Sequence, residues 1–169
     1  MAETSPIDVF FSYAPEDEHL KGKLEDHLAL LRRQGLVRGW SARSIGAGED
    51  WRGEVDRHLE RADLILLLVS ADLLASDYLF DREMRRAVAR HESGDAEVIP
   101  VILRACDWRE APFAEVRPRP RTLPENGVPV TAWSDLDAAL TDVTCGIREA
   151  VRRRLSANPP PAHHPSPSW

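Results

Sequence analysis

Residues 64–69 read Leu-Ile-Leu-Leu-Leu-Val, the longest purely apolar run in the chain. A strand inside a parallel sheet is buried on both faces, so its sequence is continuously apolar rather than alternating. The run is far shorter than the stretch of about 20 apolar residues that a membrane-spanning helix needs. We therefore interpret residues 64–69 as the central strand of a parallel sheet.

Strand and helix patterns alternate on both sides of this run. Short β-branched or aromatic runs predict strands at residues 7–13, 36–37, 97–103 and, weakly and at an edge, 128–130. Pro100 predicts one missing ladder hydrogen bond in the fourth strand. Apolar residues at helical spacing predict the intervening helices: Leu20, Leu24, Leu28 and Leu31; Trp51, Val55, Leu59 and Ala62; Phe80, Met84, Ala87, Val88 and His91; and Leu136, Leu140, Val143, Ile147 and Val151. The expected fold is α/β and flavodoxin-like, a five-stranded parallel sheet of order 2-1-3-4-5 with helices on both faces.

The chain of 169 residues and 19.0 kDa has the length of one domain. We expect this domain over residues 7–155, after an N-terminal extension at 1–6. Residues 156–169 contain five of the 13 prolines and are expected to form a Pro-rich linker or a disordered tail. The natural chain therefore either continues into another domain or ends in a bland tail.

Composition narrows the possible functions. The net charge of −6 argues against a general nucleic-acid binder, which needs a basic surface. Cys106 and Cys145 are too few for a disulfide scaffold and too isolated for a zinc site. The N-terminus has neither the basic start nor the apolar stretch of a signal peptide. These features predict a cytoplasmic protein without a metal or a membrane partner.

The usual cofactor motifs of this fold class are missing from the sequence. Residues 12–16, at the turn that ends the first strand, contain no glycine, so the G-x-G-x-x-G dinucleotide motif is absent. A phospho-acceptor domain would need an aspartate after the third strand, where Val69 and Ser70 stand. No P-loop and no G-x-S-x-G hydrolase motif occurs anywhere.

Glu83 is the candidate functional carboxylate of this sequence. At about 100° per residue, it falls roughly 40° outside Ala87 and borders the predicted buried face of its helix. A partly desolvated carboxylate over the carboxyl ends of the strands is a candidate for function. The alternative from the helical wheel alone is a structural ion pair with Arg86, three residues later.

Five ordered blocks resemble the Toll/interleukin-1 receptor (TIR) domain family, and its bacterial branch in particular. Together they cover roughly residues 7–152. Residues 8–13 resemble the first-strand motif of the family, Trp40 to Trp51 resemble its second-strand loop, and residues 62–70 resemble its third strand. Residues 76–83 resemble the stretch that ends in the family's glutamate, and residues 98–108 and 129–133 resemble the last two strands. The resemblance implies a flavodoxin-like sheet. It also implies cleavage of NAD+ at the nicotinamide–ribose bond, which is the reaction of an NAD+ glycohydrolase or cyclase.

The resemblance assigns roles to individual residues. Glu83 falls on the catalytic glutamate of the family. Phe11, Ser12 and Tyr13 at the end of the first strand, Arg43 in the second-strand loop and Tyr78 fall on substrate-binding positions. The family needs no cofactor or metal, since NAD+ is the substrate.

Partners and biological role also come from the resemblance. Active members self-associate through TIR–TIR contacts, in some proteins with a fused sensor domain or other TIR proteins, and serve as anti-phage or cell-suicide effectors. Here Ala42 replaces the usual loop aspartate, a departure that favours the alternative of a non-catalytic signalling scaffold. A host-directed mimic of animal TIR domains is a third possibility.

Overall fold

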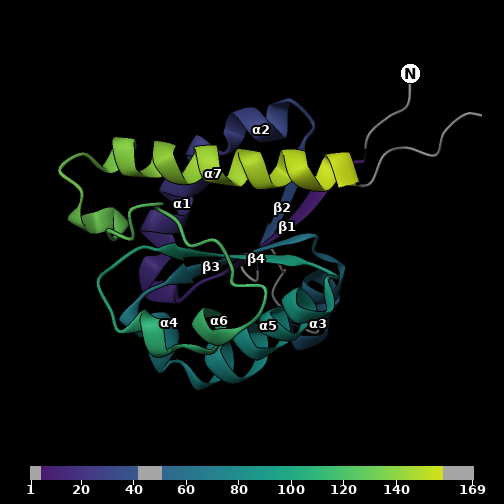
Figure 1. The fold of residues 1–169 in the computed structure, drawn as a ribbon, viewed down its shortest axis with the longest axis horizontal. Helices are drawn as coiled ribbons and strands as arrows, with labels where there is room; N and C mark the ends of the chain where they lie inside the picture. Colours follow the sequence, from purple (N-terminus) through teal and green to yellow (C-terminus); the bar gives the residue numbers. More distant parts are fainter. Residues whose placement is uncertain (1–4, 42–50, 158–169) are drawn as a thin grey trace, which may run out of the picture.

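A parallel sheet forms the centre of the molecule (Figure 1). The computed structural model describes residues 5–41 and 51–157. Within these residues the sheet has four strands in the order β2-β1-β3-β4, all of them parallel. The strands are β1 (Ile7–Ser12), β2 (Val37–Ser41), β3 (Leu64–Val69) and β4 (Glu97–Ile102). The continuously apolar β3 is central and fully buried, as predicted.

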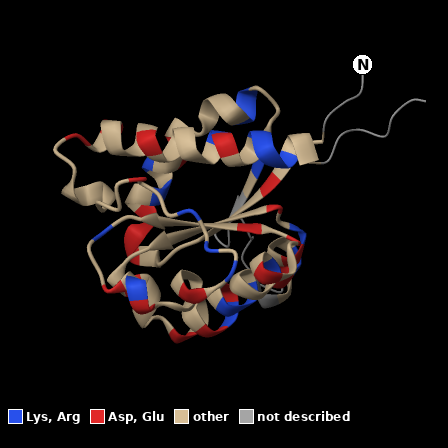
Figure 2. Cartoon of the chain, in the orientation of Figure 1, with Lys and Arg blue, Asp and Glu red and all other residues tan. Residues whose placement is uncertain are grey.

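Helices cover both faces of the sheet. On one face lie η1 (Pro15–Asp17), α1 (Glu18–His27), α2 (Ala29–Arg33) and the long α7 (Leu136–Ala157). On the other lie α3 (Trp51–Arg61), α4 (Ala71–Ala75), η3 (Leu79–Met84), α5 (Arg85–Ser93) and α6 (Pro112–Glu115). Two short 3₁₀ turns, η4 (Trp108–Glu110) and η5 (Val130–Ala132), lie in the connections after β4. Acidic and basic residues are interspersed over the helices of both layers (Figure 2).

Alternation along the strands divides the core into two layers. In β3, Leu64, Leu66 and Leu68 pack toward α1 and α7, whereas Ile65 and Leu67 pack toward α3, α4 and α5. This is the period of two expected of a strand buried on both faces. The same alternation in β1 decides which of its side chains face each layer of helices.

The prediction of a fifth strand at residues 128–130 is wrong. Val130 belongs to the 3₁₀ turn η5, and the edge of β4 is instead covered by an isolated bridge between Val101 and Leu123. The Ile102 N–H donates to the Leu123 carbonyl at 2.8 Å, and the Leu123 N–H donates to the Pro100 carbonyl at 2.9 Å. A residue's N–H and C=O leave a strand on the same side, so the missing N–H of Pro100 faces this edge, where little pairing is lost.

The C-terminal helix reaches Ala157, two residues beyond the expected end of the domain. Gly146 lies where α7 crosses the Leu123 segment. A Cβ atom at Gly146 would lie 2.5 Å from Cδ2 of Leu123, so a glycine allows this close approach. Among the described residues, no helix combines the length and apolar character required to cross a membrane.

Candidate functional site

Glu83 lies in η3, a π-helical segment that leads directly into α5. Its side chain is buried, with only 3% of its surface exposed. The wider π turn changes the phase of the helix, so a wheel drawn at 100° per residue places Glu83 too far toward solvent. π-Helical segments are rare and frequently occur at functional sites. The alternative ion pair with Arg86 does not form, because Arg86 binds Glu60 of α3, with Nη2 to Oε2 at 2.7 Å.

The Glu83 carboxyl adjoins the carboxyl end of β1, where η3 packs. Burial raises its pKa from the ordinary 4.5 to about 7, because a desolvated carboxylate is less stable in its charged form. The hydroxyl of Ser12 partly opposes this rise in the pKa, although the two groups lack the geometry of a full hydrogen bond. The negative charge of Asp56 on α3 adds to the rise. Glu83 therefore exists in both protonation states near neutral pH.

The structure brings Ser12 to Glu83 but directs two other predicted residues elsewhere. Phe11 and Tyr13 belong to the core layer beneath α1 and α7, on the face of the sheet opposite Glu83. There the ammonium of Lys21 lies 5.5 Å from the ring centre of Phe11 and 5.3 Å from that of Tyr13. Only the backbone of these two residues shares the strand end with Ser12.

The remaining predicted site residues are Tyr78 and Arg43. Tyr78 immediately precedes η3 and packs, partly buried, against the same core layer as Met84, the neighbour of Glu83. Arg43 and the loop through Asp50 lie outside the described residues. The cysteines, Cys106 half-buried and Cys145 exposed, are both free.

A polar network that the sequence analysis missed crosses the same edge of the sheet. Asp17, which follows β1, is 1% exposed and accepts a hydrogen bond from Ser70 Oγ at 2.5 Å. Arg104, which follows β4, donates from Nε to Asp17 at 2.8 Å and also binds Asp72. The sequence does contain a signal for this network, because each of these polar residues closely follows a predicted strand. The carboxyl ends of parallel strands lie at the same edge of the sheet, so residues that follow them come close together. The network ties three strand ends together beside the candidate site.

The site can stabilise positive charge. Across the described part of the chain, no cation pairs with the Glu83 carboxylate, and no three His, Cys, Asp or Glu side chains gather in a way that could hold a metal ion. A buried carboxylate of this kind interacts strongly with any positive charge that develops nearby, because little water screens the interaction.

Comparisons with known proteins agree with the fold. The sequence model of the TIR domain matches residues 9–136. A Sinorhizobium fredii protein, named "Uncharacterized protein y4lF", is 50% identical over 155 residues, which are 91% of this chain and 47% of that protein. The chain thus spans about half the length of this relative.

A solved structure extends the comparison to the fold. The TIR domain of the Toll-related receptor TRR-2 from Hydra magnipapillata superposes with a TM-score of 0.57 at 16% identity, covering 85% of this chain and 97% of that domain. At this identity the likeness concerns the fold alone. The sequence match, in contrast, spans most of the chain, and it establishes that this chain belongs to the TIR domain family.

Proposed function

We propose that this TIR domain cleaves NAD+ at the nicotinamide–ribose bond, with Glu83 as the catalytic carboxylate. The observation that carries the proposal is the burial of Glu83 beside Ser12 with no cationic partner among the described residues. Leaving a buried carboxylate uncompensated destabilises a fold, so such groups concentrate at functional sites. The family resemblance of residues 76–83 is the second support.

The chemistry requires few groups. The bond between ribose C1′ and the pyridinium nitrogen breaks, its electron pair goes to the nitrogen, and nicotinamide leaves as a neutral molecule that needs no acid. Positive charge develops on the ribose, as in glycoside hydrolysis, and the Glu83 carboxylate stabilises it. Water then attacks C1′ and loses a proton, giving ADP-ribose; attack by a group of the same molecule gives a cyclic isomer.

Self-association belongs to the proposal. TIR domains commonly self-associate, and we propose that assembly of this domain activates cleavage. Loss of cellular NAD+, or the nucleotide product, would then act as the effector in defence against phage or in cell suicide. A signalling scaffold without turnover is the alternative function.

The test compares the purified chain with Glu83→Gln, which keeps the size of the side chain and removes its charge. Both proteins are clustered on a surface at high density with NAD+, and the products are separated by chromatography. The matched control is Glu115→Gln, the same change at an exposed position of α6. We expect nicotinamide release by the wild type and the control, and a loss of at least about 100-fold in Glu83→Gln.

Each result has a defined meaning. Equal release by Glu83→Gln and the wild type would refute the role of Glu83 while leaving the activity in place. No release by a folded and clustered wild type would refute the enzyme and favour the scaffold. The second product separates hydrolysis from cyclisation.

A further inference from the structure

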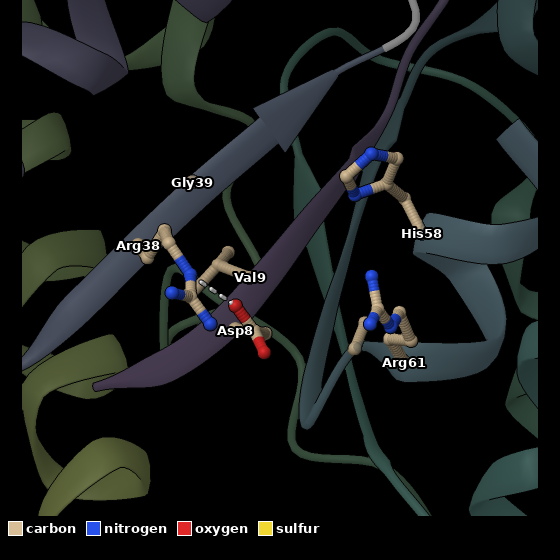
Figure 3. A pocket seen from close by; sticks show the side chains of 7 residues that line it. Asp8, Val9, Arg38, Gly39, His58 and Arg61 are labelled. Atoms are coloured by element: carbon tan, nitrogen blue, oxygen red, sulfur yellow. Dashed lines mark hydrogen bonds and ion pairs between the residues drawn. The ribbon is translucent and has the colours of Figure 1, made fainter. Parts of the chain in front are cut away.

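A cavity of about 410 Å³ lies between the first two strands and the C-terminal end of α3 (Figure 3). Its size is within the range of small-molecule sites. Asp8, the second residue of β1, contributes to its wall, whereas Ser12 is the last residue of that strand. Four residues at about 3.3 Å each separate the two positions by about 13 Å. The cavity is therefore distinct from the Glu83 site.

One wall of the cavity carries a fixed ion pair. The parallel register sets Asp8 beside Arg38, and Arg38 Nε donates to Asp8 Oδ1 at 2.7 Å. The peptide N–H of Asp8 donates to Oδ2 of Asp63 at 3.0 Å, which also holds Asp8 in place. This pairing uses one carboxylate oxygen of Asp8 and one guanidinium nitrogen of Arg38. The second carboxylate oxygen can still accept a hydrogen bond, and the terminal nitrogens of Arg38 can still donate.

The facing wall holds the guanidinium of Arg61 and the imidazole of His58, whose Nε2 lies 3.7 Å from Oε2 of Glu54. His58 and Arg61 extend from the end of α3 on the other side of the cavity (Figure 3). In the described part of the chain, no carboxylate pairs with the exposed guanidinium of Arg61. The cavity thus presents an acceptor at Asp8, beside Arg38, on one wall and donors at Arg61 and His58 on the other.

We propose that this cavity binds a phosphorylated sugar, with the phosphate at Arg61 and His58 and a sugar hydroxyl at Asp8. Guanidinium groups bind phosphate oxygens through paired, charge-assisted hydrogen bonds. A simple anion would gain from Arg61 but would be repelled by Asp8. A ligand that carries both a phosphate and a hydroxyl can bind Arg61 with the phosphate and donate a hydrogen bond to Asp8 with the hydroxyl. The Asp8 carboxylate should therefore favour a sugar phosphate over free phosphate.

The probe is ribose 5-phosphate, compared with inorganic phosphate and with ribose. Binding is followed through the amide signal of Gly39, which lines the cavity, in nuclear magnetic resonance spectra of the ¹⁵N-labelled chain. We expect saturable binding of ribose 5-phosphate that is tighter than binding of either fragment. Arg61→Gln should weaken it about tenfold or more. The control Arg33→Gln makes the same charge change on α2, across the sheet, and should leave binding intact.

Two further readouts locate the ligand groups. Asp8→Asn should reduce the preference for ribose 5-phosphate over inorganic phosphate, because it removes the repulsion that disfavours the free anion. Burial and the charges of Arg61 and Arg57 lower the pKa of His58, against the opposing effect of Glu54 and Asp8. Bound phosphate should raise that pKa, as followed by the imidazole proton signals.

Three outcomes would overturn the proposal. These are no saturable shift at Gly39, binding unaffected by Arg61→Gln, and equal affinity for ribose 5-phosphate and inorganic phosphate. Shifts confined to the Ser12 end of β1 would place the ligand at the other site and would likewise overturn it. Because the readout is binding and not turnover, none of these outcomes depends on whether the domain cleaves NAD+.

Discussion

Replacing Glu83 with glutamine should make the stability of this domain less dependent on pH. In the unfolded chain a glutamate ionises with a pKa near 4.5, whereas burial raises the pKa of Glu83 in the folded state to about 7. Between these values the folded state holds a proton that the unfolded state has released. The contribution of protonated Glu83 to the free energy of unfolding is therefore fully present below pH 4.5 and is lost as the pH rises through 7.

The size of the effect follows from the two pKa values. A rise from 4.5 to about 7, at about 1.4 kcal/mol per pH unit, corresponds to about 3 kcal/mol lost at high pH. Glutamine has no such titration. The free energy of unfolding of Glu83→Gln, minus that of the wild type, should thus increase by about 2–3 kcal/mol between pH 5 and pH 8.

Urea unfolding of both proteins at several pH values, followed by tryptophan fluorescence, measures this difference. All other titrating groups are common to the two proteins and cancel in it. Glu115→Gln provides the control, since an exposed carboxyl should give a small and constant difference. A Glu83→Gln difference that stays constant within about 0.5 kcal/mol from pH 5 to pH 8 would refute the reasoning.

The same ionisation should control the proposed activity. Stabilisation of a developing positive charge requires the ionised carboxylate, so kcat/KM for NAD+ should rise with pH around 7. The pyridinium of bound NAD+ favours ionisation of a neighbouring carboxylate, so the midpoint for kcat should lie lower. Activity that is flat from pH 5.5 to pH 8 would contradict this role of Glu83.

Three further changes test the packing around the sheet. Gly146→Ala should lower the midpoint of urea unfolding, because the new methyl group would clash with Leu123. The clash should cost about 1–3 kcal/mol, which exceeds the gain of about 1 kcal/mol from the higher helix propensity of alanine. An increased midpoint would refute the close packing. Arg90→Met should cost about 2–4 kcal/mol in the same assay, since the buried guanidinium binds the Leu59 carbonyl at 2.6 Å and the Ala62 carbonyl at 2.7 Å at the end of α3. Arg104→Gln should cost about 1–3 kcal/mol by leaving the buried carboxylate of Asp17 without its cation. This is less than for a fully buried ion pair, because 36% of the Arg104 side chain is exposed and Asp17 keeps the Ser70 hydroxyl. A loss below about 0.5 kcal/mol would show that the network contributes little.

The sequence predicted most of the sheet but not its edge. A continuous apolar run identifies a central strand wherever both faces are covered, and β3 follows this rule. Among the described residues, a single residue, Leu123, bridges to β4 at this edge, and one bridging residue next to a proline leaves no periodic pattern to detect. The apolar residues at 128–130 gave a stronger strand signal, yet Val130 forms a 3₁₀ turn.

Two predictions about the candidate site, the position of Glu83 and the grouping of Phe11 and Tyr13 with Ser12, differ from the structure for different reasons. Glu83 was placed at the border of the buried face because the wheel assumed a regular α-helix, and a π-helical segment cannot be recognised from side-chain spacing of that period. Phe11 and Tyr13 were grouped with Ser12 from the resemblance. Side chains alternate between the two faces of a strand, so Ser12 points to the same face as Phe10, whereas Phe11 and Tyr13 point to the other. Phe10 packs in the helix layer that contains Glu83, so alternation alone already selects Ser12 as the residue near Glu83.

Two buried carboxylates at the same edge of the sheet have contrasting surroundings. Asp17 is 1% exposed, and the fold supplies both a guanidinium from Arg104 and a hydroxyl from Ser70. Glu83 is 3% exposed, and among the described residues it has only the weak contact with Ser12 and the repulsion of Asp56. A carboxylate whose role was structural would be expected to have a partner like that of Asp17, since an unpaired buried charge is destabilising. The contrast supports the proposed role of Glu83, because NAD+ would bring the missing positive charge on its pyridinium and develop it further on the ribose.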